Sequence, residues 1–459
     1  MTHSVPASVD VLVVGGGACG ALVALHLLRA GGLRVGLVDP GPRPARGVAY
    51  STPRGEHLLN VPAARMSAFD DVPDDFVAFL RGHPDMAQYA HDALPTLFAP
   101  RRLYGEYLQA RLDAAPSRET LALMTDRVVD VLRDGDGYTA ELGSGTRLQA
   151  RAVVLASGNP PGALPCDRDG EGVAIEAWDY AAVADIAEDA DVCIVGAGLS
   201  MVDVLVTLQA KGHRGRVLAI SRTGLKPLAH APGTVPQAGG VEAMLPLGVR
   251  ARMRLLRQWA GDATAQGRPW QDALERLRPQ VRALWQSWPV AEQRRFLRHA
   301  VRLWDIHRHR IAPAVAAIVD DMAADGRFEL RAGRLHRIAR HDTRLQVGWT
   351  PRDAAATTTT VDVVVNATGM EKRLPRMPGP LLPALYARGL VAPGPLGLGL
   401  ATGGEGELLD ARGQPWPRLW TLGANRIGDL WETIAMPELR GQAARVAAAA
   451  AESLAPRDA

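Results

Sequence analysis

The sequence predicts an α/β fold with two parallel-sheet units and a mainly helical insertion. Two observations predict the units, because an apolar strand pattern, a glycine-rich turn and an apolar helix pattern follow one another near residue 15 and again near residue 196. A third predicts the insertion, since residues 236–313 consist of long amphipathic stretches rich in Arg, Leu and Trp. We therefore expect two Rossmann-like dinucleotide-binding domains.

The first unit contains a complete strand, turn, helix, strand and acid pattern, with its turn at residues 15–20. Gly15 permits the sharp bend, Gly17 lets backbone amides approach a pyrophosphate, and Gly20 allows the helix to pack closely on the strand. The helix N-terminus then faces the anion. Asp39 ends the next strand pattern, where a carboxylate can accept hydrogen bonds from ribose hydroxyls.

The second unit repeats this pattern with Gly196 and Gly198, followed by Ser200, but Met201 replaces the third glycine. At the end of the next strand, Arg222 stands where the first unit has its acid. A guanidinium group can hold a 2′-phosphate that a carboxylate would repel. The sequence therefore predicts a site for NADH or NADPH, and the alternative is a structural unit kept without its ligand.

The composition argues against several other classes of protein. Cys19, Cys166 and Cys193 form no CxxC or CxxxxC pair, which argues against a dithiol reductase, a zinc ribbon or a disulfide framework, and no metal site is predicted. The net charge is +3 without a basic tail or stripe, so no nucleic-acid partner is expected. No apolar run approaches the ~20 residues that span a bilayer. We expect a cytoplasmic protein with no membrane partner.

Composition and strand patterns divide the chain into a discontinuous first domain, a discontinuous second domain and the insertion. The first domain is expected over 1–165 and 358–459, and the second over 166–235 and 314–357. Helices are expected over 75–81 and 102–112, and strands over 127–133, 138–141, 146–149, 152–155, 328–330, 345–349 and 361–365.

Further turns extend the pattern beyond the two glycine-rich units. The segments 156–158 and 367–369, together with the terminal segment at Gly423, resemble those of two-dinucleotide flavoproteins. In such proteins FAD occupies the first unit and NAD(P)H the second. The cofactor contacts that this resemblance adds are Ser157, Gly158, Thr368, Gly369 and Gly423.

Shorter motifs at 47–50, 59–62, 101–107, 304–310 and 431–433 resemble a bacterial FAD/NAD(P)-binding family. One activity of that family is FAD-dependent urate hydroxylation. The resemblance implies a monooxygenase that uses FAD, NADH or NADPH and molecular oxygen to hydroxylate a small nitrogen heterocycle, with urate to 5-hydroxyisourate as the most specific prediction. Another oxidoreductase, such as an N-hydroxylase or an oxidase, and a non-catalytic flavin-binding interaction protein remain open.

The insertion carries the candidate anion-binding residues. Spacings of three and four residues place Arg294, Arg298 and Arg302 on one helical face. Directed guanidinium donors on this face could bind an anionic substrate or a 2′-phosphate. The alternative is a solvated helix face neutralised by nearby acids such as Glu292.

No catalytic acid or base is assigned, because a flavin carries the electron and oxygen chemistry itself. His307 could carry a proton near neutral pH, but the neighbouring Arg308 and Arg310 disfavour its charged form. Asn60 could bond the flavin or the substrate, or could form a structural turn.

Overall fold

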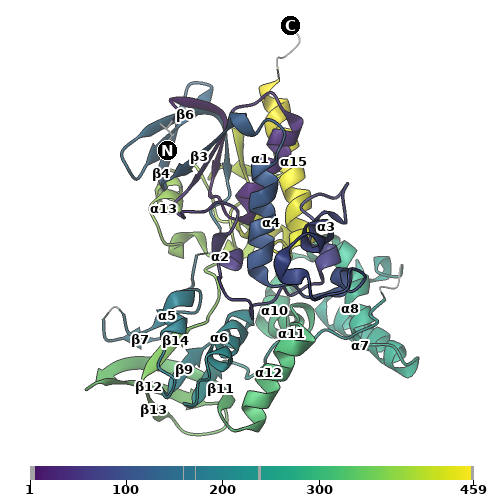
Figure 1. The fold of residues 1–459 in the computed structure, drawn as a ribbon, viewed down its shortest axis with the longest axis vertical. Coiled ribbons are helices and arrows are strands. Elements are labelled where there is room, and N and C mark those ends of the chain that lie inside the picture. The colour runs from purple at the N-terminus through teal and green to yellow at the C-terminus, as the bar shows by residue number, and fades with distance from the viewer. Residues whose placement is uncertain (1–5, 159, 171, 236–238, 456–459) are drawn as a thin grey trace. The chain divides into compact units, whose positions relative to one another are not determined.

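The chain forms two compact units in the computed structural model (Figure 1). Unit 1 contains Met1–Pro53, Pro62–Pro160 and Glu371–Ala459, and unit 2 contains Arg54–Val61 and Pro161–Met370. The structure describes residues 6–158, 160–170, 172–235 and 239–455. No helix in these ranges is both long enough and apolar enough to cross a membrane.

Unit 1 is built on a largely parallel sheet. Its strands lie in the order β15 (Glu407–Leu409), β16 (Pro415–Thr421), β6 (Arg147–Leu155), β1 (Ser8–Val14), β2 (Val35–Asp39) and β3 (Leu121–Thr125). β1 is central, because Val11 is paired with Val35 on one side and Ala152 on the other. β4 (Val128–Asp134) and β5 (Gly137–Leu142) add an antiparallel extension to β6.

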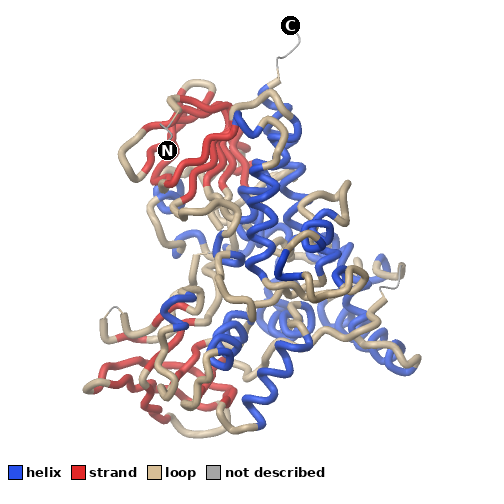
Figure 2. The backbone as a smooth tube through the Cα atoms, viewed as in Figure 1, coloured by secondary structure: helices blue, strands red, loops and turns tan. Residues whose placement is uncertain are grey.

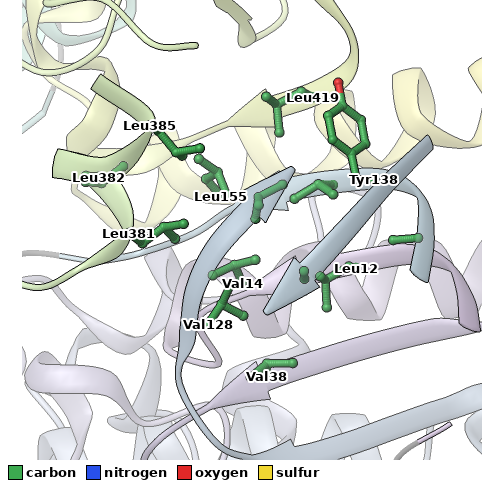
Figure 3. Packing of buried hydrophobic residues seen from close by; sticks show 14 of the residues in the cluster. Leu12, Val14, Val38, Val128, Tyr138, Leu155, Leu381, Leu382, Leu385 and Leu419 are labelled. Carbon is green, nitrogen blue, oxygen red and sulfur yellow. The ribbon is translucent and has the colours of Figure 1, made fainter. Parts of the chain in front are cut away.

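Apolar side chains fill both faces of this sheet, as expected for a central parallel strand. One core cluster joins Leu12 of β1, Leu155 of β6 and Leu419 of β16 to the leucines of α13 (Leu381–Ala387) (Figure 3). On the other face, α1 (Ala18–Ala30) packs between α4 (Arg101–Asp113) and α15 (Met436–Leu454) (Figure 1). The buried alanines of α1 and α15 let these two helices approach closely.

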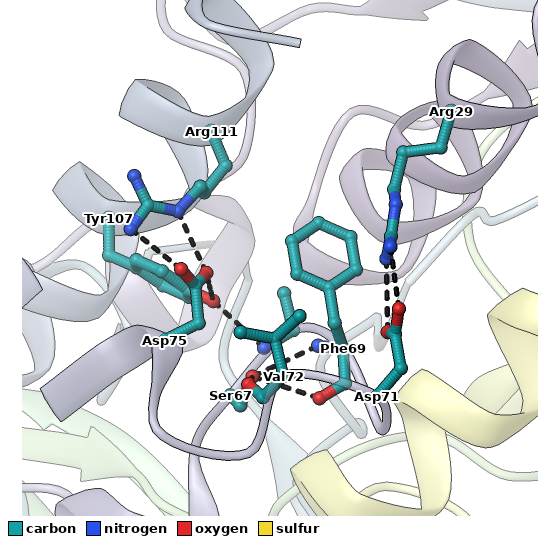
Figure 4. Close-up of polar contacts among 9 residues, drawn as sticks. Arg29, Ser67, Phe69, Asp71, Val72, Asp75, Tyr107 and Arg111 are labelled. Carbon is teal, nitrogen blue, oxygen red and sulfur yellow. Dashed lines mark hydrogen bonds and ion pairs between the residues drawn. The ribbon is translucent and has the colours of Figure 1, made fainter. Parts of the chain in front are cut away.

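A polar network fixes the connection between β2 and α4 (Figure 4). The Asp75 carboxylate, at the start of α3 (Asp75–Arg81), accepts hydrogen bonds from the Tyr107 hydroxyl at 2.6 Å and from Arg111 Nε at 2.8 Å. Burial, together with the bond to Asp75, raises the pKa of Tyr107. Arg29 of α1 makes a two-pronged ion pair with Asp71, at 2.6 and 3.1 Å. Together these bonds anchor the loop that precedes α3 to α1 and α4.

Unit 2 has a second sheet of mixed direction. Its order is β13 (Thr357–Val361), β12 (Arg344–Pro351), β11 (Phe328–His341), β10 (Val217–Ser221), β9 (Val192–Val195), β14 (Val363–Asn366) and β8 (Ile175–Glu176). The strands from β11 to β8 are parallel, and β12 and β13 continue the sheet as an antiparallel meander. α6 (Leu199–Ala210) packs against α5 (Tyr180–Ala184) and α12 (Pro313–Ala324), and β7 (Asp167–Arg168) pairs with β11.

The insertion is mainly helical, as predicted, and Figure 2 shows it as helices joined by short loops. Its first residues, 236–238, lie outside the described ranges. Its helices are α7 (Val249–Ala265), α8 (Gln271–Leu277), α9 (Val281–Gln286), α10 (Val290–His299) and α11 (Val301–Arg308). The buried Arg252 of α7 donates to the carbonyl of Leu284 and to the Ser287 hydroxyl, both at 2.6 Å. Burial lowers the pKa of Arg252 to about 10, so it stays charged at neutral pH.

Several elements differ from the sequence prediction. The expected strands at 146–149 and 152–155 form one strand, β6, and β3 was not predicted. The strand expected over 361–365 is divided between β13 and β14. Because β14 pairs with β9, the unit boundary falls at residue 371 and not at 358.

Residues 54–61, expected in the first domain, also belong to unit 2. The physical reason is the contact of His57 with α6. Its Nε2 lies 2.8 Å from Thr207 Oγ1 and 3.2 Å from the carbonyl oxygen of Asp203. His57 and Thr207 are both almost fully buried, so this short segment is part of the unit 2 interior.

The Asp75 network provides a stability test. Asp75→Ala should lower the free energy of unfolding of unit 1 by about 1–3 kcal/mol, because a buried tyrosine hydroxyl and a guanidinium group lose their acceptor. Urea unfolding followed by circular dichroism measures the change. Asp74→Ala, at an exposed neighbouring residue, is the control and should leave the midpoint nearly unchanged. Equal midpoints for the two variants would contradict the role of the network.

Candidate dinucleotide sites

The first glycine turn brings backbone segments too close together for side chains. Gly15 has a φ of +100°, and a Cβ there would lie 2.3 Å from the carbonyl oxygen of Ala156. A Cβ on Gly20 would lie 1.9 Å from the carbonyl oxygen of Gly15. Only glycine fits at either position, so α1 starts directly at the carboxyl end of β1.

The N-terminus of α1 retains backbone donors for an anion. In the described part of the chain, no side chain caps Gly17, and the first turn of α1 contains no acid. The first N–H groups of a helix lack intrahelical partners and carry the positive end of its dipole. The nearest atom to a Cβ on Gly17 would be the Cα of Gly47, at 3.4 Å. The arrangement therefore fits a pyrophosphate held by backbone amides.

Asp39 ties the end of β2 to this turn. Its Oδ2 accepts a hydrogen bond from the Gly16 amide, and its Oδ1 accepts one from the Gly41 amide, both at 2.7 Å. A carboxylate offers about four lone-pair sites, so these bonds leave capacity for ribose hydroxyls. The sequence indicated a ribose-binding role, whereas the bond to the turn itself appears only in the structure.

Ser157 and Gly423 lie beside the start of α1, at the ends of two further strands of unit 1. The Ser157 hydroxyl accepts from Asn425 Nδ2 at 3.1 Å, and the Gly423 amide donates to Gln442 Oε1 at 3.0 Å. Gly423 has a φ of +70°, and a Cβ there would meet Cys19 Sγ at 2.9 Å. Gly158 also has a positive φ, +79°. The sites expected after β6 and β16 are thus adjacent to the first glycine turn.

Two buried amides hold this C-terminal part of the site, and the sequence analysis missed both. Asn425 also donates to the Thr421 hydroxyl at 2.9 Å, and Gln442 of α15 donates to the Thr433 hydroxyl at 2.9 Å. Both amides are 2% exposed. Their signal in the sequence is weak, since each lies among other polar residues, Asn425 beside Arg426 and Gln442 near Arg440, and no pattern marks it as buried. Buried amides of this kind need partners, and here those partners fix the turn at Gly423.

The second glycine turn has a similar backbone geometry. Gly196 has a φ of +121°, and a Cβ there would lie 2.2 Å from the carbonyl oxygen of Ala367. Gly198 begins α6 with no side-chain cap among the described residues, and the first turn contains no acid. Met201 is fully buried where the first unit has its third glycine. The Ser200 hydroxyl accepts from Trp178 Nε1 at 3.0 Å.

Thr368 and Gly369 border this second turn, although they were expected in the first domain. They follow β14, which pairs with β9. The Thr368 hydroxyl donates to Asn366 Oδ1 at 2.7 Å, and the amide of Asn366 donates to the carbonyl of Gly162 at 2.8 Å. Both residues therefore belong to unit 2 and lie beside its glycine turn.

The insertion contributes one arginine to the second turn. Arg302 Nη2 donates to the carbonyl oxygens of Ala197 at 2.6 Å and Leu225 at 2.5 Å. Arg222 lies exposed just after β10. The continuous arginine face expected from the spacing is wrong, because α10 ends at His299 and α11 begins at Val301. Arg298 lies exposed on α10, and Arg302 belongs to the next helix.

The remaining candidates have mainly structural contacts. Arg310 forms a buried ion pair with Glu275, and Arg308 is also buried, so neither presents an exposed anion-binding group. His307 Nδ1 donates to the carbonyl of Leu303 at 2.7 Å, and its ring meets Trp270 edge-on. The carbonyl of Asn60 accepts from His230 Nε2 at 2.8 Å within unit 2.

The comparisons with known proteins agree with this architecture. Residues 12–160 match a family model described as FAD-NAD(P)-binding. No curated protein sequence matches the chain significantly. The ornithine N-hydroxylase of Kutzneria sp. 744, described with reduced FAD, NADP+ and L-ornithine, is 13% identical and superposes with a TM-score of 0.68 over 97% of this chain and 99% of that chain.

Two further solved structures have the same fold. L-lysine 6-monooxygenase from Pseudomonas syringae is 15% identical, with a TM-score of 0.69 over 97% of this chain and 100% of that chain. Bacillithiol disulfide reductase from Bacillus cereus is 15% identical, with a TM-score of 0.54 over 97% and 99%. These similarities confirm the predicted α/β fold with its two parallel-sheet units.

The space around Gly17 provides a test of the first site. Gly17→Leu should abolish flavin retention, because its side chain would occupy the space through which the pyrophosphate approaches the amides of α1. The bound flavin is measured by absorbance, and folding by circular dichroism. Gly261→Ala in α7, where a Cβ meets no atom within 4 Å, is the control. Normal flavin content in folded Gly17→Leu would contradict the placement of the pyrophosphate.

Proposed function

We propose that the chain is an FAD-dependent monooxygenase that oxidises NADPH or NADH and hydroxylates a nitrogen atom of a small amine. The observation that carries this proposal is the pair of glycine turns, each at the carboxyl end of a parallel strand and each followed by a helix without a side-chain cap among the described residues. Ligands of such sheets bind at this end of the strands. The glycine turn of each unit would therefore bind one dinucleotide.

In unit 1 the proposed ligand is FAD. The first amides of α1 would bind its pyrophosphate, and Asp39 its adenosine ribose. Ser157, Gly158 and Gly423 would line the adjoining part of the site. When bound, FAD supplies electron transfer from the nicotinamide and activation of oxygen. The residues of this chain bind, orient and shield it.

In unit 2 the proposed ligand is the nicotinamide dinucleotide. Gly196, Gly198 and the first amides of α6 would hold its pyrophosphate. Arg222 would contact a 2′-phosphate, which favours NADPH over NADH. Thr368 and Gly369 would border the same ligand, a proposal supported by the approach of Ala367 to Gly196.

The choice of an amine is supported by the similar structures. Two of the reported structures are named as hydroxylating enzymes of ornithine and lysine, with TM-scores of 0.68 and 0.69, whereas the disulfide reductase has 0.54. Burial raises the pKa of Cys19 to about 12, so this thiol is protonated at neutral pH and unsuited to thiol exchange. Urate hydroxylation is supported by short sequence motifs alone, and we therefore rank it second.

The proposed reaction has a simple balance. One oxygen atom of O2 enters an N–H bond of the amine to give a hydroxylamine. The other oxygen atom is reduced to water. NADPH supplies two electrons and one proton as a hydride, and solvent supplies the second proton. The reaction therefore consumes one NADPH for each hydroxylamine formed when the two processes are fully coupled.

Purified protein tests this proposal directly. We expect a yellow flavoprotein whose absorbance bleaches when NADPH is added without oxygen. Under air, L-ornithine, L-lysine or cadaverine, amines handled by the similar enzymes, should accelerate NADPH oxidation and gain the mass of one oxygen atom. Gly17→Leu is the control for flavin dependence.

The same experiment separates the alternatives. Loss of urate absorbance with oxygen uptake, and no change in the amines, would favour the urate hydroxylase. NADPH oxidation that yields only peroxide with every substrate would favour an oxidase. Failure of NADPH to reduce a bound flavin would contradict the monooxygenase and favour a flavin-binding interaction protein.

A further inference from the structure

Arg302 links the helical insertion to two turns of the unit 2 sheet. Ala197 lies in the turn that follows β9, and Leu225 lies in the turn that follows β10. Both carbonyl oxygens accept from the same Arg302 nitrogen, Nη2. β9 and β10 are neighbouring parallel strands, with Val195 paired with Ile220. The guanidinium group of Arg302 therefore bridges the ends of two adjacent strands.

These two turns correspond to two parts of a bound dinucleotide. In a doubly wound sheet, the pyrophosphate lies over the glycine turn and the adenosine ribose lies at the end of the next strand. A group that spans both turns lies next to the ribose 2′ position. The Ser221 hydroxyl, which accepts from the Gly224 amide at 3.0 Å, shapes the turn on the ribose side.

The charge at this place is positive and lacks a matched carboxylate. Across the described ranges, neither Arg222 nor Arg302 forms an ion pair. Burial lowers the pKa of Arg302, Asp305 opposes this shift, and the nearby positive charge of Arg222 adds to it. Two neighbouring guanidinium groups repel each other, and a dianion between them would relieve the repulsion.

We propose that Arg302 is the second guanidinium group of a 2′-phosphate site and that, with Arg222, it determines selectivity for NADPH. This inference rests on the proposed function only in assigning a nicotinamide dinucleotide to unit 2. The two carbonyls fix the plane of the Arg302 guanidinium through Nη2. Nε and Nη1 then remain as donors to phosphate oxygens. The preference for NADPH thus depends on the helical insertion as well as on the sheet.

Binding of nucleotide fragments tests the inference without any catalysis. Adenosine 2′,5′-bisphosphate carries the 2′-phosphate, and adenosine 5′-monophosphate lacks it. Titration calorimetry on the full chain should show that Arg302→Met weakens binding of the bisphosphate about 10- to 100-fold, as expected for a lost charge-assisted hydrogen bond, with the monophosphate nearly unaffected. Arg222→Ala should have the same selective effect.

Two further variants separate recognition from a structural role. Arg302→Lys keeps the charge but loses the forked donor, so its affinity for the bisphosphate should lie between those of the wild type and Arg302→Met. If Arg302→Met fails to fold, Arg302→Lys alone still tests the inference. Arg254→Met, at an exposed arginine of α7, is the matched control and should leave both affinities unchanged.

The outcomes are distinct. If Arg302→Met and Arg302→Lys weaken the binding of both fragments equally, Arg302 only attaches α11 to the sheet. If neither affinity changes, Arg302 has no role in nucleotide binding. Failure of the wild type to bind either fragment would overturn both this inference and the assignment of NADPH. Selective binding in a chain that hydroxylates no substrate would support the inference and contradict the monooxygenase.

Discussion

The approach of Gly20 to the carbonyl oxygen of Gly15 is the constraint on which the first site depends. A Cβ on Gly20 would lie 1.9 Å from this oxygen, so only glycine lets the first turn of α1 pack against the turn that follows β1. The first amides of α1 therefore lie at the carboxyl end of β1. Asp39, Ser157 and Gly423 then gather around the same turn.

The second unit keeps the first glycine, which has a positive φ in both turns, and differs in several other residues. Ala367 lies against Gly196 as Ala156 lies against Gly15. In each unit the residue after a neighbouring parallel strand, β14 or β6, therefore packs on the glycine turn. Met201, at the position equivalent to Gly20, has a fully buried side chain. Arg302 donates to the turns after both β9 and β10, whereas the first turn is tied to the chain at and beyond the end of β2 by Asp39 and by the Ala45 amide, which donates to the Gly16 carbonyl at 2.6 Å. The two turns thus share a backbone geometry but differ in the charged side chains beside them.

The fold and both turns could be predicted because their signals are local. Glycine at a positive φ and the alternation of strand and helix patterns need no distant partner. The positions of Asn425, Gln442 and residues 54–61 depend on contacts far along the chain, and nothing nearby in the sequence specifies them. The break at Ala300 was missed for a different reason, because the helical spacing of arginines continues through it. The nucleotide roles of the candidate residues stay predictions.

The interleaving of the two units along the chain has a consequence for assembly. The polypeptide leaves unit 1 after Pro53, returns at Pro62, leaves again after Pro160 and returns at Glu371. No uninterrupted fragment contains all of one unit without part of the other. During synthesis, β16 and α15 emerge last, so the first sheet cannot be completed until unit 2 has been made. Truncation from either end therefore removes part of unit 1 and cannot release it as an intact domain.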